Sequence, residues 1–243
     1  MSQFKMASKK QVTLDNSSYS WKETNLMEFL DEGNIPSRWD EFFKKPEVLE
    51  ELRKISDNLE KASKEKTIYP PINQVFRALY KVGPDAKCVI VGQDCYHNGS
   101  AVGLCFSVRP GNALNPSMLS IYKELKMEGF EPVEDGDLTR WADQGVLLLN
   151  MALTVEKGDP GSHSLLWYNF SEMLVKYISS CGDGDFPHWL LFGKDAHAIK
   201  DIADRGQFHM TSHPVPMAAH RKCGEAPAFW GSGVFKKVPG VKW

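Results

Sequence analysis

The sequence lacks the patterns that mark several large classes of protein. Its 243 residues include five cysteines, an odd number without a Cys-x-x-Cys pair, which fits neither a disulfide framework nor a structural zinc site. No apolar run reaches the roughly 18 residues of a membrane span, and the N-terminus lacks the apolar core of a secretory signal. We therefore expect a soluble, intracellular protein in a reducing compartment, with no membrane partner.

Several catalytic motifs are absent as well. Neither Gly-x-Gly-x-x-Gly nor Gly-x4-Gly-Lys-Ser/Thr occurs, so a dinucleotide or ATP site has no support. The His-x-Glu and Pro-Cys-x-x-Cys pair of zinc deaminases and the Gly-x-Ser-x-Gly turn of serine hydrolases are also missing.

The formal net charge is 29 minus 31, or −2, which argues mildly against a nucleic-acid binder. Its distribution is uneven, because residues 217–243 carry five cations against the single acid Glu225. The cations are Arg221, Lys222, Lys236, Lys237 and Lys242. This segment forms either a basic face or an ordinary solvated surface.

Length and a hydrophobic content of 42% suit a single domain with a proper core. Residues 1–20 mix Ser, Lys, Gln and Asn without periodicity and are expected to form a flexible tail, which leaves 21–243 as the domain. Amphipathic spacing predicts helices from Pro46, over 72–80, from a Ser117 cap to Gly129, around Trp141, over 165–178 and over 193–205.

Short apolar runs at 88–91, 146–149, 189–192 and 208–212 predict four strands that alternate with these helices. The alternation predicts an α/β fold with a central, mainly parallel four-stranded sheet and helices on both faces. Asp94, Asn150, Gly193 and His213 follow the four strands, so they should meet at one sheet edge, where such folds bind ligands. Taken singly, a helix cap, a turn residue, a turn glycine and a core histidine remain the alternatives.

The residues at these strand ends resemble a known family. Gly92-Gln-Asp-Cys-Tyr-His97 is similar to the Gly-Gln-Asp-Pro-Tyr-His water-activating loop of family 1 uracil-DNA glycosylases, and His213-Pro-Val-Pro-Met217 resembles that family's DNA-inserting His-Pro-Ser-Pro-Leu loop. Asn115-Pro-Ser117 resembles its proline-serine loop, and Leu147 to Asn150 with Leu153-Thr-Val155 its uracil-reading strand. The similarity runs in order over residues 39–238.

The resemblance implies a monofunctional DNA repair enzyme that flips uracil out of DNA and hydrolyses its N-glycosidic bond, leaving an abasic site. Asn150 would read the base edge, Phe106 would stack on the base, and Tyr96 would exclude the methyl group of thymine. Asp94 would assist the attacking water, while His213 and the backbone N–H of Gln93 would stabilise negative charge on the departing base. No metal or cofactor is implied.

The implied partners are single- or double-stranded DNA containing uracil and a DNA-mimicking inhibitor protein, and a monomer is expected. The residues that would contact DNA on this resemblance are Ser117, Lys194, Pro214, Val215, Pro216, Met217 and Arg221.

Three departures from the family pattern stand out. Cys95 replaces a proline, so we expect a looser loop with unusual geometry at that residue and retained activity. Val215, Ala218 and Lys194 stand where the family has serines, which should make DNA binding more dependent on salt. Met217 replaces the leucine wedge with another apolar side chain.

Three rival functions remain. A non-catalytic DNA-binding or processivity factor on the same fold would need none of Asp94, Asn150 and His213. A glycosylase with broader base preference is disfavoured by Tyr96. A small-molecule hydrolase is supported only by the negative net charge.

Overall fold

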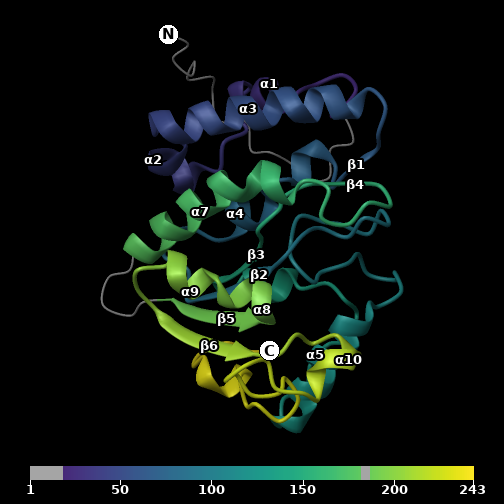
Figure 1. The fold of residues 1–243 in the computed structure, drawn as a ribbon, viewed down its shortest axis with the longest axis vertical. Helices are drawn as coiled ribbons and strands as arrows, with labels where there is room; N and C mark the ends of the chain where they lie inside the picture. The colour runs from purple at the N-terminus through teal and green to yellow at the C-terminus, as the bar shows by residue number, and fades with distance from the viewer. Residues whose placement is uncertain (1–18, 182–186) are drawn as a thin grey trace.

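The computed structural model describes residues 19–181 and 187–243, so the predicted tail lies almost entirely outside the described residues. The central sheet contains β2 (Cys88–Gly92), β3 (Val146–Asn150), β5 (His188–Phe192) and β6 (Gln207–Thr211). Its order is β3-β2-β5-β6, and every neighbouring pair is parallel, which confirms the predicted sheet (Figure 1). β2 is an inner strand and β3 an edge strand, and both are buried throughout, as expected for a parallel sheet covered on both faces.

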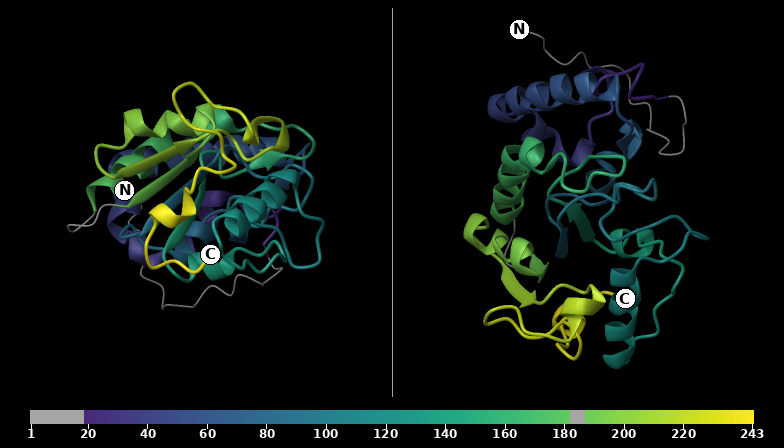
Figure 2. Two further views of the ribbon diagram at one scale, coloured as in Figure 1. Left: turned by 90° about the horizontal axis from the view of Figure 1, so that it is seen from below. Right: turned by 45° about the vertical axis from the view of Figure 1, so that its right-hand side comes forward.

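Helices surround this sheet. They are α1 (Leu26–Asp31), α2 (Asp40–Phe43), α3 (Pro46–Ser63), α4 (Arg77–Lys81), α5 (Pro116–Met127), α6 (Thr139–Ala142), α7 (Ser164–Ser180), α8 (Lys194–His197), α9 (Ile199–Ile202) and α10 (Pro216–Ala219), with short 3-10 turns at Ser37–Trp39, Ile72–Gln74 and Phe235–Lys237. Figures 1 and 2 show α1 to α3 stacked on α7 at one end of the molecule and the C-terminal segment beside α5 and α10 at the other.

Two predicted helices are interrupted in the structure. The segment 72–80 divides into a 3-10 turn and α4, because a neighbouring loop crosses it so closely that a Cβ on Gly103 would lie 1.9 Å from the carbonyl oxygen of Gln74. The segment 193–205 divides into α8 and α9, between which His197 Nε2 contacts the carbonyl oxygen of Thr211 at 2.8 Å. In both places tertiary contacts override local periodicity.

Other elements were not predicted from the sequence. Helices α1 and α2 lie in a stretch that was assigned only to the domain, and β1 (Ile68–Tyr69) pairs with β4 (Val155–Glu156) as a two-stranded antiparallel ribbon. This ribbon joins the segment that follows β3 to the N-terminal half of the chain. No helix in the two described ranges has the length and apolar character needed to cross a bilayer.

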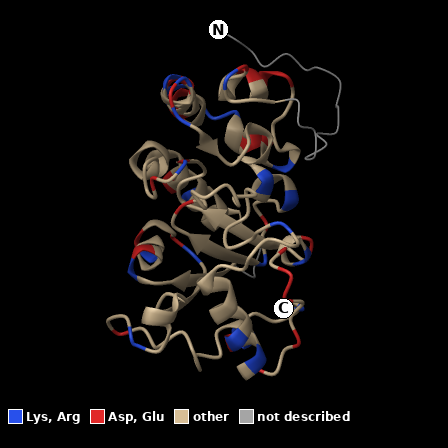
Figure 3. Ribbon diagram, turned by 90° about the vertical axis from the view of Figure 1, so that its right-hand side faces the viewer, with Lys and Arg blue, Asp and Glu red and all other residues tan. Residues whose placement is uncertain are grey.

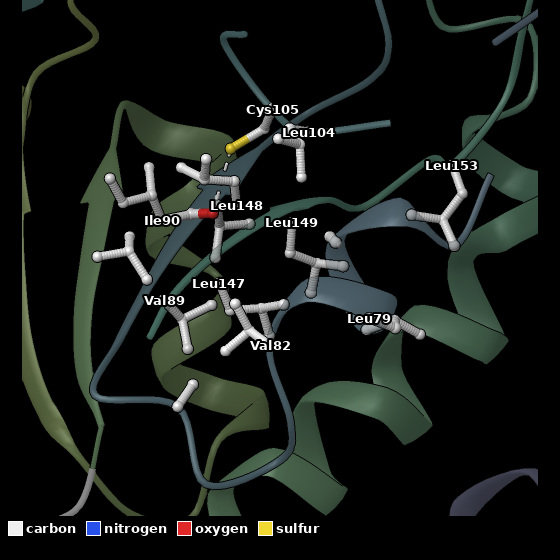
Figure 4. Close-up of a cluster of buried hydrophobic side chains, with 14 of the residues drawn as sticks. Leu79, Val82, Val89, Ile90, Leu104, Cys105, Leu147, Leu148, Leu149 and Leu153 are labelled. Carbon is white, nitrogen blue, oxygen red and sulfur yellow. Dashed lines mark hydrogen bonds between the residues drawn. The ribbon is translucent and has the colours of Figure 1, made fainter. Parts of the chain in front are cut away.

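The hydrophobic core lies on both sides of the sheet and extends beneath the N-terminal helices. Figure 4 shows Leu147, Leu148 and Leu149 of β3 packed beside Val89 and Ile90 of β2. The indole N–H of Trp39 donates to the carbonyl oxygens of Leu79 and Val82, both at 2.9 Å, and joins the N-terminal helices to α4.

Two buried carboxylates, Glu124 in α5 and Glu128 directly after it, hold the C-terminal segment. Glu124 accepts hydrogen bonds from the backbone N–H groups of Gly231 at 2.6 Å and Gly233 at 3.0 Å, and Glu128 accepts from Phe235 at 3.1 Å and Lys236 at 2.7 Å. Burial is the main cause that raises the pKa of Glu128, and the two N–H donors oppose it. Hydrogen bonds to a charged acceptor are stronger than neutral ones, so these contacts fix the segment on α5.

We expect Glu124→Ala to lower the free energy of unfolding by about 3 kcal/mol, because it removes two hydrogen bonds from backbone N–H groups to a buried carboxylate. Chemical denaturation followed by tryptophan fluorescence measures this. Glu131→Ala is the matched control, since Glu131 follows the same helix but is exposed. Equal stability of the two variants would contradict the anchoring role of Glu124.

Candidate active site

The loops that follow β2 and β3 run side by side past the sheet edge. The strand register places Gly92 opposite Asn150, and beyond it the N–H groups of Met151 and Ala152 donate to the carbonyl oxygens of Gly92 and Gln93, both at 2.9 Å. A Cβ at position 92 would lie 2.3 Å from Asn150 Oδ1, so only glycine allows this approach. The ladder therefore brings the Asn150 amide to the loop that carries Asp94.

The carboxylate of Asp94 is half-buried and oriented by one backbone group. Its Oδ2 accepts a hydrogen bond from the N–H of Gly161 at 2.7 Å. Gly161 has φ +77°, a left-handed conformation that favours glycine, in the turn that precedes α7. The sequence reasoning missed Gly161: the Asp159-Pro160-Gly161 turn signal could have located the bend but not its contact with Asp94.

A buried polar network supports this turn. Thr154 Oγ1 lies 2.9 Å from His163 Nδ1 and accepts a hydrogen bond from the indole of Trp167 at 2.7 Å. Burial lowers the pKa of His163, while the nearby carboxylate of Glu156 acts in the opposite direction. The network joins the end of the β3 loop to the first turn of α7 and so holds the segment that carries Gly161.

His213 follows β6 and is held in one tautomer. Its Nδ1 accepts the backbone N–H of Val215 at 3.0 Å, so the neutral ring carries its proton on Nε2. Burial lowers the pKa of His213 below its usual value, and the negative charge of Asp195 only partly opposes this. The ring is therefore a neutral hydrogen-bond donor at neutral pH.

Phe106 and Tyr96 are joined to each other and to His213. The hydroxyl of Tyr96 donates to the carbonyl oxygen of Phe106 at 3.3 Å, and burial raises the pKa of this tyrosine. The Phe106 ring centroid lies 6.3 Å from that of His213 and 6.2 Å from that of Phe192.

Unusual backbone geometry occurs at Phe106 and not at Cys95, where it was expected. Phe106 has φ 61°, the one positive φ among the described residues other than glycine. An aromatic residue held there costs on the order of 1–3 kcal/mol, which the surrounding contacts must offset. Just before Asp94 and Cys95, the N–H groups of Met151 and Ala152 donate to the carbonyl oxygens of Gly92 and Gln93 and so join this loop to the β3 loop.

The predicted site residues line two separate cavities. Asp94, Cys95, Tyr96, Phe106 and Asn150 line a cavity of about 10 Å³, which holds roughly one water molecule. Gln93, Gly193, Lys194 and His213 line the second, of about 480 Å³, which extends towards α7 and α9. The structure thus brings Asp94 and Asn150 together around the smaller cavity, and it places His213 in the larger one, with its ring 6.3 Å from that of Phe106. A pyrimidine enters the smaller cavity only if side chains move.

The residues expected to contact DNA are mostly at the surface. Met217 in α10 is 81% exposed, Pro216, Lys194 and Arg221 are exposed, and Ser117 and Val215 are partly exposed, whereas Pro214 is buried. Helix α10 packs against α5, which puts the Met217 loop beside the helix that begins with Pro116 and Ser117. Asn115, and not Ser117 as predicted, is the N-cap residue of α5.

The cations of the C-terminal segment are not neutralised by acids. No ion pair within the described residues involves Arg221, Lys222, Lys236, Lys237 or Lys242. Elsewhere basic and acidic residues are interspersed along the helices (Figure 3). These cations, like the exposed Lys194, therefore carry charge that is available for an anionic partner.

Burial raises the pKa of the Cys95 thiol to about 12, the Asn150 amide opposes this shift, and the Asp94 charge adds to it. The thiol is therefore protonated and has little reactivity. Among residues 19–181 and 187–243, no group of three or more His, Cys, Asp or Glu side chains could hold a metal ion.

Comparison with known proteins agrees with this geometry. Residues 80–231 match the family described as the uracil DNA glycosylase superfamily. A uracil-DNA glycosylase of Azotobacter vinelandii is 40% identical over 195 residues, 77% of this chain and 80% of its own length. One of Escherichia coli is 45% identical over 162 residues, 64% of this chain and 70% of its own length.

Solved structures show the same fold. Mimivirus uracil-DNA glycosylase superposes with a TM-score of 0.81 at 24% identity, covering 92% of this chain and 90% of its own. A variant of mimivirus UNG in complex with UGI gives 0.77 at 25% identity, covering 84% and 83%. With the Asp94, Asn150 and His213 strand ends in place, the match to the family over residues 80–231 and the 40% identity to a curated relative over 77% of the chain, the chain belongs to the uracil DNA glycosylase superfamily.

Proposed function

We propose that the protein is a DNA repair glycosylase that hydrolyses the N-glycosidic bond of uracil in DNA, releasing uracil and leaving an abasic site. The observation that carries this is the meeting of Asp94 and Asn150 at adjacent strand ends, with the His213 ring 6.3 Å from that of Phe106. It occurs in a chain that is 40% identical to a uracil-DNA glycosylase over 195 residues. The non-catalytic alternative has no support, since the curated relatives compared above are all named as glycosylases.

Base recognition is assigned to the smaller cavity. Asn150 would accept from N3–H of uracil and donate to O4, whereas cytosine presents the opposite pattern and would leave buried groups unpaired. Phe106 would stack on the base. Tyr96, held by its hydrogen bond to the Phe106 carbonyl oxygen, would occupy the space beside C5 and exclude the methyl group of thymine.

Bond cleavage is assigned to Asp94 and His213. The Asp94 carboxylate would hold the attacking water with Oδ1, the oxygen that Gly161 does not engage, and would stabilise positive charge on the sugar. His213, with its proton on Nε2, would donate to O2 of uracil as negative charge grows there, together with the backbone N–H of Gln93. A neutral donor serves here because uracil leaves as an anion.

DNA binding is assigned to the surface around this site. Exposed Met217 would fill the space left by the flipped base, while Lys194 and Arg221 would contact phosphates. The first turn of α5 with Ser117 and the loop from Pro214 to Pro216 would contribute further backbone contacts. An inhibitor protein that mimics DNA is a proposed partner, supported by a similar mimivirus UNG solved in complex with UGI.

Asp94→Asn should reduce the rate of uracil release from single- and double-stranded oligonucleotides by a factor of roughly 10² to 10⁴, because it removes the carboxylate beside the water. Single-turnover kinetics measure the rate, and a DNA-binding assay should show unchanged affinity. Asp201→Asn, an exposed carboxylate of α9, is the control. No release by the wild-type protein would exclude the proposed function.

Because burial lowers the pKa of His213, its ring should become charged only below about pH 6.5, the usual pKa of histidine. The rate of uracil release should therefore not change between pH 8 and about 6.5. Protonation on Nδ1 breaks the hydrogen bond from Val215 and disturbs the loop. NMR titration of the His213 ring, assigned with His213→Asn, measures the pKa directly. A midpoint above that of a free histidine would contradict the assignment.

Lys194→Ala should reduce the slope of log affinity against log salt concentration by about one, because one phosphate contact is lost. Fluorescence anisotropy with a uracil-containing strand over a salt series measures the slope. Lys200→Ala, an exposed lysine of neighbouring α9, should leave it unchanged. Equal slopes in all three proteins would remove Lys194 from the DNA contact surface.

A further inference from the structure

The sulfur of Cys95 lies between the β2 and β3 loops, in contact with Asn150. Asn150 Nδ2 donates to Cys95 Sγ at 3.4 Å, and Cys95 Sγ donates to the carbonyl oxygen of Ala152 at 3.5 Å. Both side chains are almost completely buried, Cys95 at 5% and Asn150 at 7% exposure. The three groups form a short chain of hydrogen bonds shielded from water.

This chain has a defined direction. The thiol is protonated, so its single hydrogen goes to the Ala152 carbonyl oxygen and its lone pairs face the Asn150 amide. A sulfur in that position accepts a hydrogen bond and has none left to donate. The sulfur therefore favours the orientation in which Asn150 Nδ2 faces it and disfavours the orientation in which Asn150 Oδ1 faces it.

The orientation of the Asn150 amide decides which base the smaller cavity accepts. With one N–H on Cys95, the amide keeps its second N–H and Oδ1, which accepts no hydrogen bond from the described residues. That pair matches O4 and N3–H of uracil. Rotated by 180°, the amide would present its nitrogen to N3 and its oxygen to position 4, which matches cytosine.

Shape alone does not select between the two orientations. The Asn150 oxygen lies over Gly92, where there is no side chain, and an NH₂ group has nearly the same size as an oxygen. A hydrogen-bonding partner has to make the choice, and Cys95 Sγ is the partner that contacts the amide.

We propose that Cys95 is a specificity-determining positioning residue, whose sulfur holds the Asn150 amide in the orientation that reads uracil and rejects cytosine. The inference rests on the proposed function. It gives the cysteine, which stands where the family pattern has a proline, a role in base selection.

The other buried cysteines provide a comparison within the same chain. Cys105 Sγ contacts the carbonyl oxygen of Ile90 at 3.3 Å (Figure 4), and Cys88 is fully buried in the first position of β2, four residues from Gly92. Neither thiol is hydrogen-bonded to Asn150. Cys88→Ala removes a buried thiol without touching the amide and is therefore the matched control.

The test compares wild type, Cys95→Ala, Cys95→Ser and Cys88→Ala. Inhibition of uracil release by free uracil and by free cytosine reports the amide orientation, kcat and KM are measured separately, and thermal denaturation reports folding. In Cys95→Ala we expect free uracil to inhibit about tenfold more weakly, the size of one lost hydrogen bond, and the preference for uracil over cytosine to narrow by at least that factor. Cys95→Ser keeps a hydrogen-bond acceptor and donor at this position and should retain the preference for uracil over cytosine. Cys88→Ala leaves the amide contact intact and should retain it as well.

Two results would overturn the inference. One is an unchanged uracil-to-cytosine ratio in folded Cys95→Ala, and the other is an equal loss in Cys95→Ala and Cys95→Ser. If Cys95→Ala does not fold, Cys95→Val, which fills the space without accepting a hydrogen bond, replaces it with the same expected loss. Failure of the wild type to release uracil is a separate outcome that contradicts the proposed function itself.

Discussion

The parallel ladder between β2 and β3 is the constraint on which the site depends. It does not end with the strands: Met151 and Ala152 continue it by donating to Gly92 and Gln93 at 2.9 Å each. Backbone hydrogen bonds in a buried setting are costly to break, so the two loops behave as one rigid unit. Asp94 belongs to one loop and Asn150 to the other, and their relative position is set by main-chain geometry before any side chain is considered.

The remaining parts of the site are fitted to this unit at some energetic cost. Phe106 is held at a positive φ, which an aromatic residue adopts only when its surroundings enforce it. Gly161 supplies an N–H to Asp94 from a turn supported by the buried Thr154, His163 and Trp167 network. These features lie where chemistry is proposed, which is where strained geometry and buried polar groups are expected to concentrate.

The cavity beside Asn150 is small and the side chain of Met217 is exposed. A cavity of about 10 Å³ does not admit a pyrimidine, so binding must open the space between Tyr96, Phe106 and Asn150. Glu124 and Glu128 fix the C-terminal segment to the end of α5, and Met217 in α10 remains exposed beside it. A sheet edge held by backbone hydrogen bonds and an exposed apolar side chain suit the proposed reaction, in which the DNA undergoes the larger change of shape.

The sequence by itself determined the four strands, their parallel arrangement and the polar residues at their ends, because buried parallel strands are short apolar runs and their carboxyl ends share one edge. It also indicated the family, through motifs at 92–97, 115–117, 147–150 and 213–217. It did not determine the breaks in the helices after Pro71 and Gly193, the β1 and β4 ribbon, or the anchoring carboxylates of α5. Only the tertiary structure decided which group orients Asp94, where the backbone is strained, and that Cys95 contacts the Asn150 amide. The contacts of Asp94 and Cys95 join residues that are far apart in the chain, and the strain at Phe106 is imposed by its surroundings. Local sequence patterns contain no information about such long-range contacts.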